Sequence, residues 1–179
     1  MILNEHLNFK QLLKNIKAIV LDVDGVLSSN KVLIDQNGEL QRFTNVKDGF
    51  AIQLAIRMGI EIAIITGGRS DAVVKRFENL GVKHIYFKVN DKNTALDDFV
   101  EKTGIKLSEI LYMGDDLIDY EVMQRVGVAT APIDAAQEIK QISIYVSQFA
   151  GGEACVRDII EQVLRIQGKW MTKEAFVLC

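Results

Sequence analysis

The sequence predicts an α/β protein built on a doubly wound, parallel, Rossmann-like sheet. Apolar runs of strand length alternate with segments of helical period along most of the 179 residues. The runs are nearly continuous and rich in β-branched residues, which is typical of strands that are buried on both faces. A chain of this length can bury one sizeable core, so we expect a single domain over residues 1–179.

Six apolar runs are the expected strands, and the segments between and after them are the expected helices. The strands are 17–23, 60–66, 84–87, 109–113, 127–130 and 143–146. The helices are about 48–58, 70–80, 92–103, 117–125, 134–140 and 152–167. Glycines follow four of these helices, and we expect each of them to end its helix in the left-handed conformation: Gly59, Gly81, Gly104 and Gly127.

One segment interrupts this alternation directly after the first strand. Residues 30–46 have extended patterning on both sides of Asn37-Gly38, a pair that strongly favours a tight hairpin turn. We therefore expect a β-hairpin between the first strand and the first helix. The C-terminal tail, about 168–179, is short and apolar, so it is either frayed or packed on another surface such as a neighbouring subunit.

Composition narrows the classes of function. The formal net charge is −3, so the chain lacks the basic excess of a nucleic-acid-binding protein. No apolar run reaches the roughly 18 residues of a membrane span, and the N-terminus has no signal-peptide pattern. Cys155 and Cys179 are too few and too far apart for a disulfide framework. We expect a cytoplasmic protein that binds neither nucleic acid nor membrane.

Polar and charged residues, together with one glycine, follow four of the expected strands. They are Asp22 and Asp24 after the first, Thr66 and Gly67 after the second, Lys92 after the third, and Asp115, Asp116 and Asp119 after the fourth. In sheets of this kind the ligand site lies outside the carboxyl ends of the strands. The sequence therefore predicts that these groups converge on one edge of the sheet.

Grouped carboxylates repel one another, and their pKa values rise unless a cation is present. Mg²⁺ is the simplest such cation, because it prefers oxygen ligands and needs only one or two protein carboxylates besides water. Together with Lys92 and the hydroxyl of Thr66, Mg²⁺ suits a phosphoryl group. Asp22 can then attack phosphorus, while Asp24 protonates the leaving alcohol and later deprotonates the hydrolytic water.

Each of these residues also has an ordinary structural explanation when it is taken alone. Aspartate at a strand end is commonly a turn or capping residue, and a single lysine is usually solvated. The joint pattern, in order and at strand ends, favours phosphoryl transfer. A phospho-accepting receiver domain is an alternative of another class, but its acceptor aspartate would follow the third strand, where this chain has Lys88 and Asn90. A non-catalytic subunit descended from such an enzyme is a further alternative.

The segments "DVDGV", "ITGG" and "GDDLID", with Lys92, resemble the four motifs of the haloacid dehalogenase superfamily of phosphotransferases, over about residues 16–168. This resemblance implies the haloacid dehalogenase-like fold. It also implies that Asp22 is the nucleophile, that Asp24 is the acid and base, and that Thr66 and Lys92 bind phosphate. A second acid next to the nucleophile favours a phosphatase over a dehalogenase, which has no alcohol to protonate.

The same resemblance implies a magnesium site and a missing cap. Mg²⁺ is expected on Asp22, the backbone carbonyl of Asp24 and Asp115, with Asp116 and Asp119 next to these ligands. Many phosphatases of the superfamily carry a cap domain that selects the substrate. About 40 residues separate Asp24 from Thr66 and about 25 separate Thr66 from Lys92, which leaves no room for one. The hairpin at 30–46 is the expected flap over the site.

Two further segments, "NVKDGFAIQLA" and "AGGEACVRDIIEQVLRIQGKW", make the chain similar to the capless family of 3-deoxy-D-manno-octulosonate 8-phosphate (KDO 8-phosphate) phosphatases. That similarity implies KDO 8-phosphate as substrate, a role in lipopolysaccharide biosynthesis, and a homotetramer in which a neighbouring subunit covers the active site. The related nonulosonate 9-phosphate phosphatases are the alternative, although "KDG" at 47–49 fits the octulosonate branch better.

A sugar acid carries a carboxylate in addition to its phosphate, so a second cationic group is expected in the site. Lys47, Arg69 and Arg76 are the candidates, with Gly67 as a further substrate-binding residue. Glu153 departs from the family pattern, because arginine or lysine is common at its position. A glutamate close to the substrate would repel an anionic sugar acid.

Overall fold

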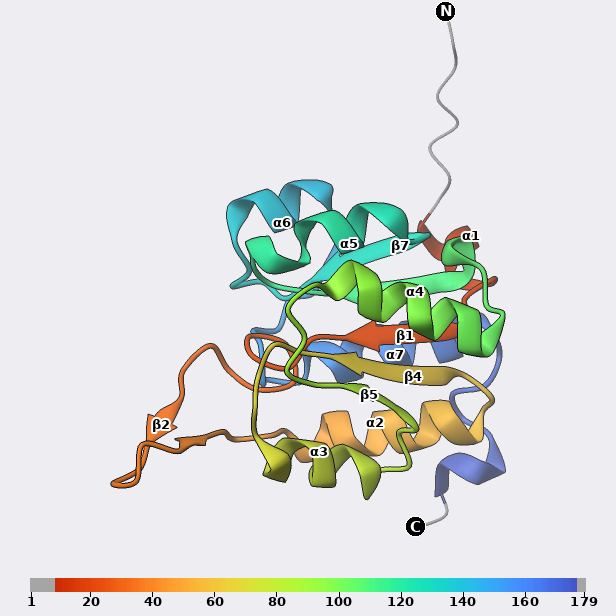
Figure 1. The fold of residues 1–179 in the computed structure, drawn as a ribbon. Coiled ribbons are helices and arrows are strands. Elements are labelled where there is room, and N and C mark those ends of the chain that lie inside the picture. Colours follow the sequence, from red (N-terminus) through yellow and green to blue (C-terminus); the bar gives the residue numbers. More distant parts are fainter. Residues whose placement is uncertain (1–8, 177–179) are drawn as a thin grey trace, which may run out of the picture.

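The fold was obtained as a computed structural model, which describes residues 9–176. Its central sheet has six parallel strands in the order β5-β4-β1-β6-β7-β8 (Figure 1). The strands are β1 (Ala18–Leu21), β4 (Glu61–Ile65), β5 (His84–Tyr86), β6 (Ile110–Met113), β7 (Val128–Ala131) and β8 (Tyr145–Val146). The predicted doubly wound parallel sheet is confirmed, and every strand lies within or next to its expected run.

Helices follow the strands as the periodicity predicts. They are α2 (Val46–Arg57), α3 (Asp71–Glu78), α4 (Lys92–Thr103), α5 (Tyr120–Arg125), α6 (Gln137–Ile142) and α7 (Cys155–Ile166). A short helix that the sequence analysis did not predict, α1 (Phe9–Leu13), precedes β1. Three 3₁₀ turns complete the described chain: η1 (Leu107–Glu109), η2 (Leu117–Asp119) and η3 (Lys173–Phe176).

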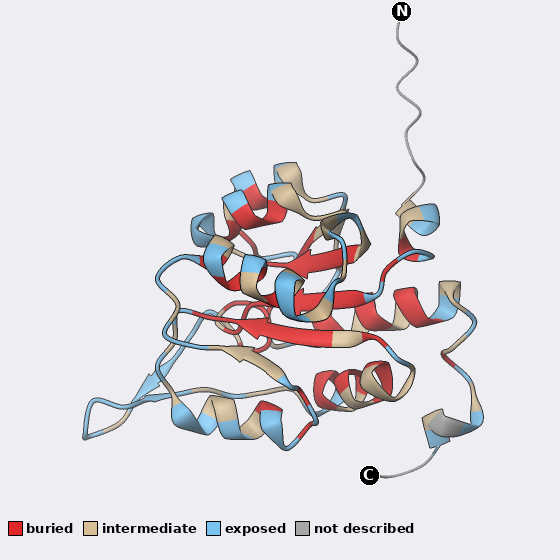
Figure 2. Cartoon of the chain, turned by 45° about the vertical axis from the view of Figure 1, so that its right-hand side comes forward, coloured by how far each residue is buried: buried red, intermediate tan, exposed pale blue. Residues whose placement is uncertain are grey.

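Alternate residues of the central strands enter two different cores, one on each face of the sheet. From β1, Ile19 and Leu21 pack with α2 and α7, whereas Ala18 and Val20 pack with α4, α5 and α6. Both faces are buried, so β1, β4 and β6 are almost entirely shielded from solvent (Figure 2). This double burial explains the uninterrupted apolar runs in the sequence, and it holds the carboxyl ends of these strands rigidly.

The predicted hairpin is present and projects from the body, at left in Figure 1. β2 (Leu33–Ile34) and β3 (Leu40–Gln41) pair antiparallel, and Gly38 turns the chain with φ +80°. The Asp35 carboxylate accepts the backbone N–H groups of residues 37 and 39, which fixes the turn. Apolar side chains on this arm face solvent, among them Ile34 and Phe43, which are 65% and 81% exposed.

Three of the four glycines expected to end helices do so, and the fourth prediction is wrong. Gly59, Gly81 and Gly104 have φ values of +78°, +88° and +68°. Gly127 is not left-handed. A Cβ on Gly127 would lie 2.2 Å from the carbonyl oxygen of Ser108, so glycine is required there by a close backbone approach rather than by a turn.

The C-terminal segment folds back on its own chain. Trp170 is 7% exposed and packs in the core shared with α2 and α7, with the guanidinium of Arg157 4.4 Å from its ring centre. The following turn, η3, lies at the end of the molecule away from the hairpin (Figures 1 and 2). Residues 177–179, including Cys179, lie outside the described residues. Within 9–176, no helix has the length and apolar character that a membrane crossing requires.

Candidate active site

A buried lysine joins two buried aspartates at the carboxyl edge of the sheet. Asp22 follows β1, and its N–H still donates to the carbonyl of Met113 in β6, so the strand geometry holds it in place. Lys92 is the first residue of α4, whose start is capped by Asp91. Its Nζ lies 3.0 Å from Asp22 Oδ1 and 2.7 Å from Asp119 Oδ1. The two ion pairs fix the lysine and both acids relative to one another.

Asp119 organises the loop that follows β6. Besides the Lys92 ammonium, its carboxylate accepts the hydroxyl of Tyr112 at 2.8 Å and the N–H of Asp115 at 3.2 Å. A Cβ on Gly114 would lie 2.5 Å from the Asp119 side chain, so only glycine allows this packing. Asp119 is fully buried and is held by hydrogen bonds on both of its oxygens.

Asp22, Asp115 and Asp119 form an acidic cluster in which one oxygen of each carboxylate lies within 4.8 Å of the others. Burial raises the pKa of Asp22 to about 7. The positive charge of Lys92 lowers this pKa, and the negative charge of Asp119 raises it further. Burial and the charges of Asp22 and Asp119 raise the pKa of Asp115 to about 8. Burial lowers the pKa of Lys92, but the negative charges of Asp22 and Asp119 outweigh this effect and hold the pKa above its usual value.

This cluster fits a hard divalent cation. Three carboxylates face one ammonium, and carboxylate oxygens are the ligands that Mg²⁺ prefers. The Asp115 carboxylate also lies directly over Gly25, where a Cβ would be 1.9 Å from it. The backbone carbonyl of Asp24 belongs to the peptide that joins Asp24 to Gly25. Of the expected ligands, Asp22 and Asp115 therefore lie together with Asp119, and Asp115 also lies against the residue that follows the Asp24 carbonyl.

The Asp24 side chain has a different partner, which the sequence analysis did not identify. Arg42, directly after β3 on the hairpin, donates from Nη2 to Asp24 Oδ2 at 2.9 Å and from Nε to Oδ1. The pair is bidentate, a strong and directional arrangement, and it holds the pKa of Arg42 above its usual value. In the sequence Arg42 is a single basic residue on a hairpin arm, which is equally typical of a solvated surface position.

Thr66 and Gly67 follow β4 and form the opposite wall. The Thr66 hydroxyl accepts the N–H of Gly68 at 3.0 Å, and its backbone binds Tyr86 and Val89. These groups surround an open cleft of about 550 Å³. The cleft is lined by Asp22, Asp24, Asn30, Leu40, Arg42, Thr66, Gly67, Gly68, Arg69, Asp115, Asp116 and Ile118.

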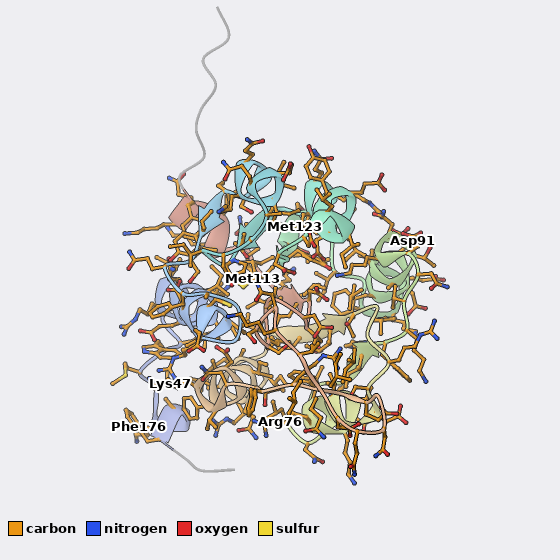
Figure 3. All side chains as sticks on the ribbon, turned by 90° about the vertical axis from the view of Figure 1, so that its left-hand side faces the viewer. Lys47, Arg76, Asp91, Met113, Met123 and Phe176 are labelled. Carbon is orange, nitrogen blue, oxygen red and sulfur yellow. The ribbon has the colours of Figure 1, made fainter. Side chains whose placement is uncertain are left out.

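The remaining predicted site residues lie at different distances from this cleft. Arg69 lines it, and Asp116 lies at its exposed rim, where its carboxylate caps η2 through the N–H of Leu117. Lys47, at the exposed start of α2, is not among the lining residues. Arg76, on α3, lines a separate groove beside the hairpin. Figure 3 looks onto the carboxyl ends of the strands and labels Lys47 and Arg76.

Comparison with known proteins places this arrangement among phosphatases. Residues 81–154 match the family model of haloacid dehalogenase-like hydrolases. The chain is 40% identical over 156 residues to the 3-deoxy-D-manno-octulosonate 8-phosphate phosphatase KdsC of Escherichia coli K12, covering 87% of this chain and 83% of the relative.

Solved structures of phosphatases of the same family have the same fold as this chain. The phosphatase of this name from Moraxella catarrhalis, in complex with magnesium ion, phosphate ion and KDO, superposes with a TM-score of 0.87 at 34% identity over 90% of this chain and 92% of that one. The cobalt-bound phosphatase of Haemophilus influenzae superposes with a TM-score of 0.88 at 31% identity, over 93% and 99% of the two chains.

We expect the metal-free protein to lose stability as the pH rises from about 4 to about 8. In that range folded Asp22 and Asp115, with pKa values of about 7 and about 8, hold protons that the unfolded chain, at the ordinary value of 3.8, has released. The free energy of unfolding therefore falls with rising pH. Mg²⁺ binds the ionised carboxylates, so it should raise Tm more at about pH 8 than at about pH 6 in calorimetry.

The control is Asp115→Asn, measured in the same buffers and with NaCl of matched ionic strength. This variant should lose most of the Mg²⁺ effect and part of the pH slope. An equal rise in wild-type Tm at both pH values would contradict a metal site made of these carboxylates.

Proposed function

Because the chain belongs to the family of KDO 8-phosphate phosphatases among the haloacid dehalogenase-like hydrolases, we propose that it hydrolyses KDO 8-phosphate to KDO and inorganic phosphate with Mg²⁺ as cofactor. The observation that carries this proposal is the acidic cluster beside Lys92 and Thr66, at one edge of a fold shared with these phosphatases. In this proposal the cluster supplies the nucleophile and the metal ligands, and Lys92 and Thr66 supply the phosphate-binding groups.

The first half of the reaction is transfer of the phosphoryl group to Asp22. One carboxylate oxygen of Asp22 bonds to phosphorus as the bond from phosphorus to the sugar oxygen breaks. The phosphoryl oxygens are bound by the ammonium of Lys92, whose Nζ lies 3.0 Å from Asp22 Oδ1, and by the hydroxyl of Thr66. Mg²⁺, held by Asp22, Asp115 and the Asp24 carbonyl, supplies the positive charge that offsets the phosphate. Asp116 and Asp119 lie next to these ligands.

Asp24 moves the protons. It gives its proton to the sugar oxygen as that oxygen leaves, and in the second half it takes a proton from the water that attacks the aspartyl-phosphate, which frees phosphate and restores Asp22. Arg42 binds both carboxylate oxygens of Asp24. The oxygens that would carry the proton are therefore also bound by Arg42, so we propose that substrate binding rearranges this pair.

Other functions are less well supported. A nonulosonate 9-phosphate would undergo the same chemistry, but the relatives named above are KDO 8-phosphate phosphatases. A receiver domain is not favoured, because β5 is followed by Lys88 and Asn90, and the next aspartate, Asp91, caps α4 and does not line the cleft.

We further propose a single-domain, cytoplasmic homotetramer that works in lipopolysaccharide biosynthesis. The exposed apolar side chains Leu33, Ile34 and Phe43 of the hairpin support burial between copies. The described part of the tail packs at the far end of its own chain (Figure 1), so a tail that covers the cleft would come from another copy.

The substrate is tested by steady-state kinetics. We expect kcat/KM for KDO 8-phosphate to exceed that for nonulosonate 9-phosphates and for simple sugar phosphates by about tenfold or more. Activity should disappear with EDTA and return with Mg²⁺. A nonulosonate 9-phosphate as the best substrate would replace the proposed substrate but keep the chemistry, whereas no turnover of any sugar phosphate would overturn the phosphatase.

The covalent mechanism is tested at the two strand-end acids. Asp22→Asn removes the attacking oxygen and should abolish turnover. Asp24→Asn removes the proton carrier and should lower kcat by about 10² to 10⁴ while phosphate still binds. Full activity of Asp22→Asn, with deamidation excluded by mass spectrometry, would contradict an aspartyl-phosphate intermediate.

Recognition of the substrate carboxylate is tested by replacing the basic residues predicted to bind it. Arg69 lines the cleft, so Arg69→Ala should lower kcat/KM for KDO 8-phosphate by about tenfold. Lys47→Ala and Arg76→Ala test the other two candidates, and Lys75→Ala on the exposed face of α3 is the control. If neither Arg69→Ala nor Lys47→Ala changes kcat/KM by more than about twofold, roughly 0.4 kcal/mol, the carboxylate site lies elsewhere.

A further inference from the structure

The turn between β8 and α7, residues 150–154, packs beneath the loop that follows Asp24. A Cβ on Gly151 would lie 2.0 Å from the carbonyl oxygen of Gly25, so no other residue fits without moving that loop. The N–H of Gly152 donates to the carbonyl of Val26 at 2.9 Å, and a Cβ on Gly152 would lie 2.6 Å from the backbone nitrogen of Ser29. Two successive glycines thus touch the loop from Gly25 to Ser29 along its length.

Two polar side chains from other elements hold this turn, and a third holds the start of the helix that follows it. Asp134 accepts the N–H of Gly151 at 2.9 Å, and Asn45 donates from Nδ2 to the carbonyl of Gly152 at 3.1 Å. Asp48, buried at the start of α2, accepts the N–H of Arg157 in the first turn of α7 at 2.6 Å. Ala154 has φ +77°, a conformation that costs a non-glycine residue energy and persists where the surroundings determine it.

Gly25 is therefore enclosed from two directions. The Asp115 carboxylate lies over its α-carbon, and Gly151 lies against its carbonyl. The peptide that precedes Gly25 carries the Asp24 carbonyl, a ligand in the proposed magnesium site. Because Gly25 is joined to this carbonyl and lies against the Asp115 carboxylate, a shift of Gly25 would move both groups.

We propose that Gly151 and Gly152 are positioning residues for the magnesium site, because the turn they form sets the place of the Asp24 carbonyl relative to the Asp115 carboxylate. This inference rests on the proposed Mg²⁺-dependent function. It assigns a role in metal binding to a turn that lies more than a hundred residues from Asp24 in the sequence and contributes no ligand itself.

The experiment is calorimetric titration of the full-length protein with MgCl₂, with Tm measured in parallel. Gly151→Ala forces the contact with Gly25 and should raise the Kd for Mg²⁺ by about tenfold or more, the usual range for groups that orient metal ligands. The control is Gly104→Ala, which strains a left-handed glycine with nothing within 4 Å of the added Cβ. It should lower Tm and leave the Kd within about twofold.

A second variant covers the case in which Gly151→Ala does not fold. Asn45→Asp keeps the oxygen that caps α2 through the N–H of Lys47 but removes the donor to the Gly152 carbonyl. It should raise the Kd for Mg²⁺ by about threefold to tenfold, and raise the Mg²⁺ concentration for half-maximal activity in parallel, with KM at saturating Mg²⁺ unchanged.

The outcomes separate this inference from the proposed function. Folded Gly151→Ala or Asn45→Asp protein that binds Mg²⁺ as tightly as wild type would overturn the positioning role while leaving the phosphatase in place. Equal weakening of Mg²⁺ binding in Gly104→Ala would also overturn it, because general destabilisation would then be the cause. Wild-type protein that binds no Mg²⁺ would overturn the magnesium site itself.

Discussion

The ammonium of Lys92, held between Asp22 and Asp119, is the interaction on which the rest of the site depends. A buried ion pair has to offset the cost of desolvating its charges. Here the offset is incomplete, because a third carboxylate, Asp115, joins the same cluster. Burial is the main cause of the raised pKa values of Asp22 and Asp115, and the charge of Asp119 adds to the rise in both. A divalent cation restores the balance, so the requirement for metal follows from the charge of the protein itself.

The sheet keeps this crowded arrangement in place. β1 lies between β4 and β6, is buried on both faces and ends directly at Asp22. Glycines then allow the loops to approach one another closely: Gly114 under Asp119 and Gly25 under Asp115. The buried strands position the acids, and glycines at the contact points allow the loops to pack around them. The site therefore uses the most deeply buried strands of the fold to hold a crowded group of charges.

Periodicity was sufficient to predict the sheet, the helices from α2 to α7 and the hairpin, because these depend on local apolar patterns. The convergence of Asp22, Lys92 and Asp115 followed from strand ends sharing one edge. Arg42 could not be found in this way, since its partner is 18 residues away and the pairing depends on how the hairpin folds back. The prediction that Gly127 is left-handed was wrong, because a close backbone contact and a left-handed turn both require glycine. The placement of Lys47 and Arg76 outside the cleft lining depends on the packing of whole helices against the sheet, which local patterns do not specify.

The bidentate pair between Arg42 and Asp24 has a consequence for how the enzyme is controlled. The hairpin is an extended arm whose tip is exposed to solvent and whose base is bound, through Arg42, to Asp24, the proposed proton carrier. A partner that packed on the tip would therefore restrain the segment that carries Arg42, the residue that binds both oxygens of Asp24. In the proposed homotetramer, a contact between copies at the tip of the hairpin would therefore bear on the residue proposed to transfer protons.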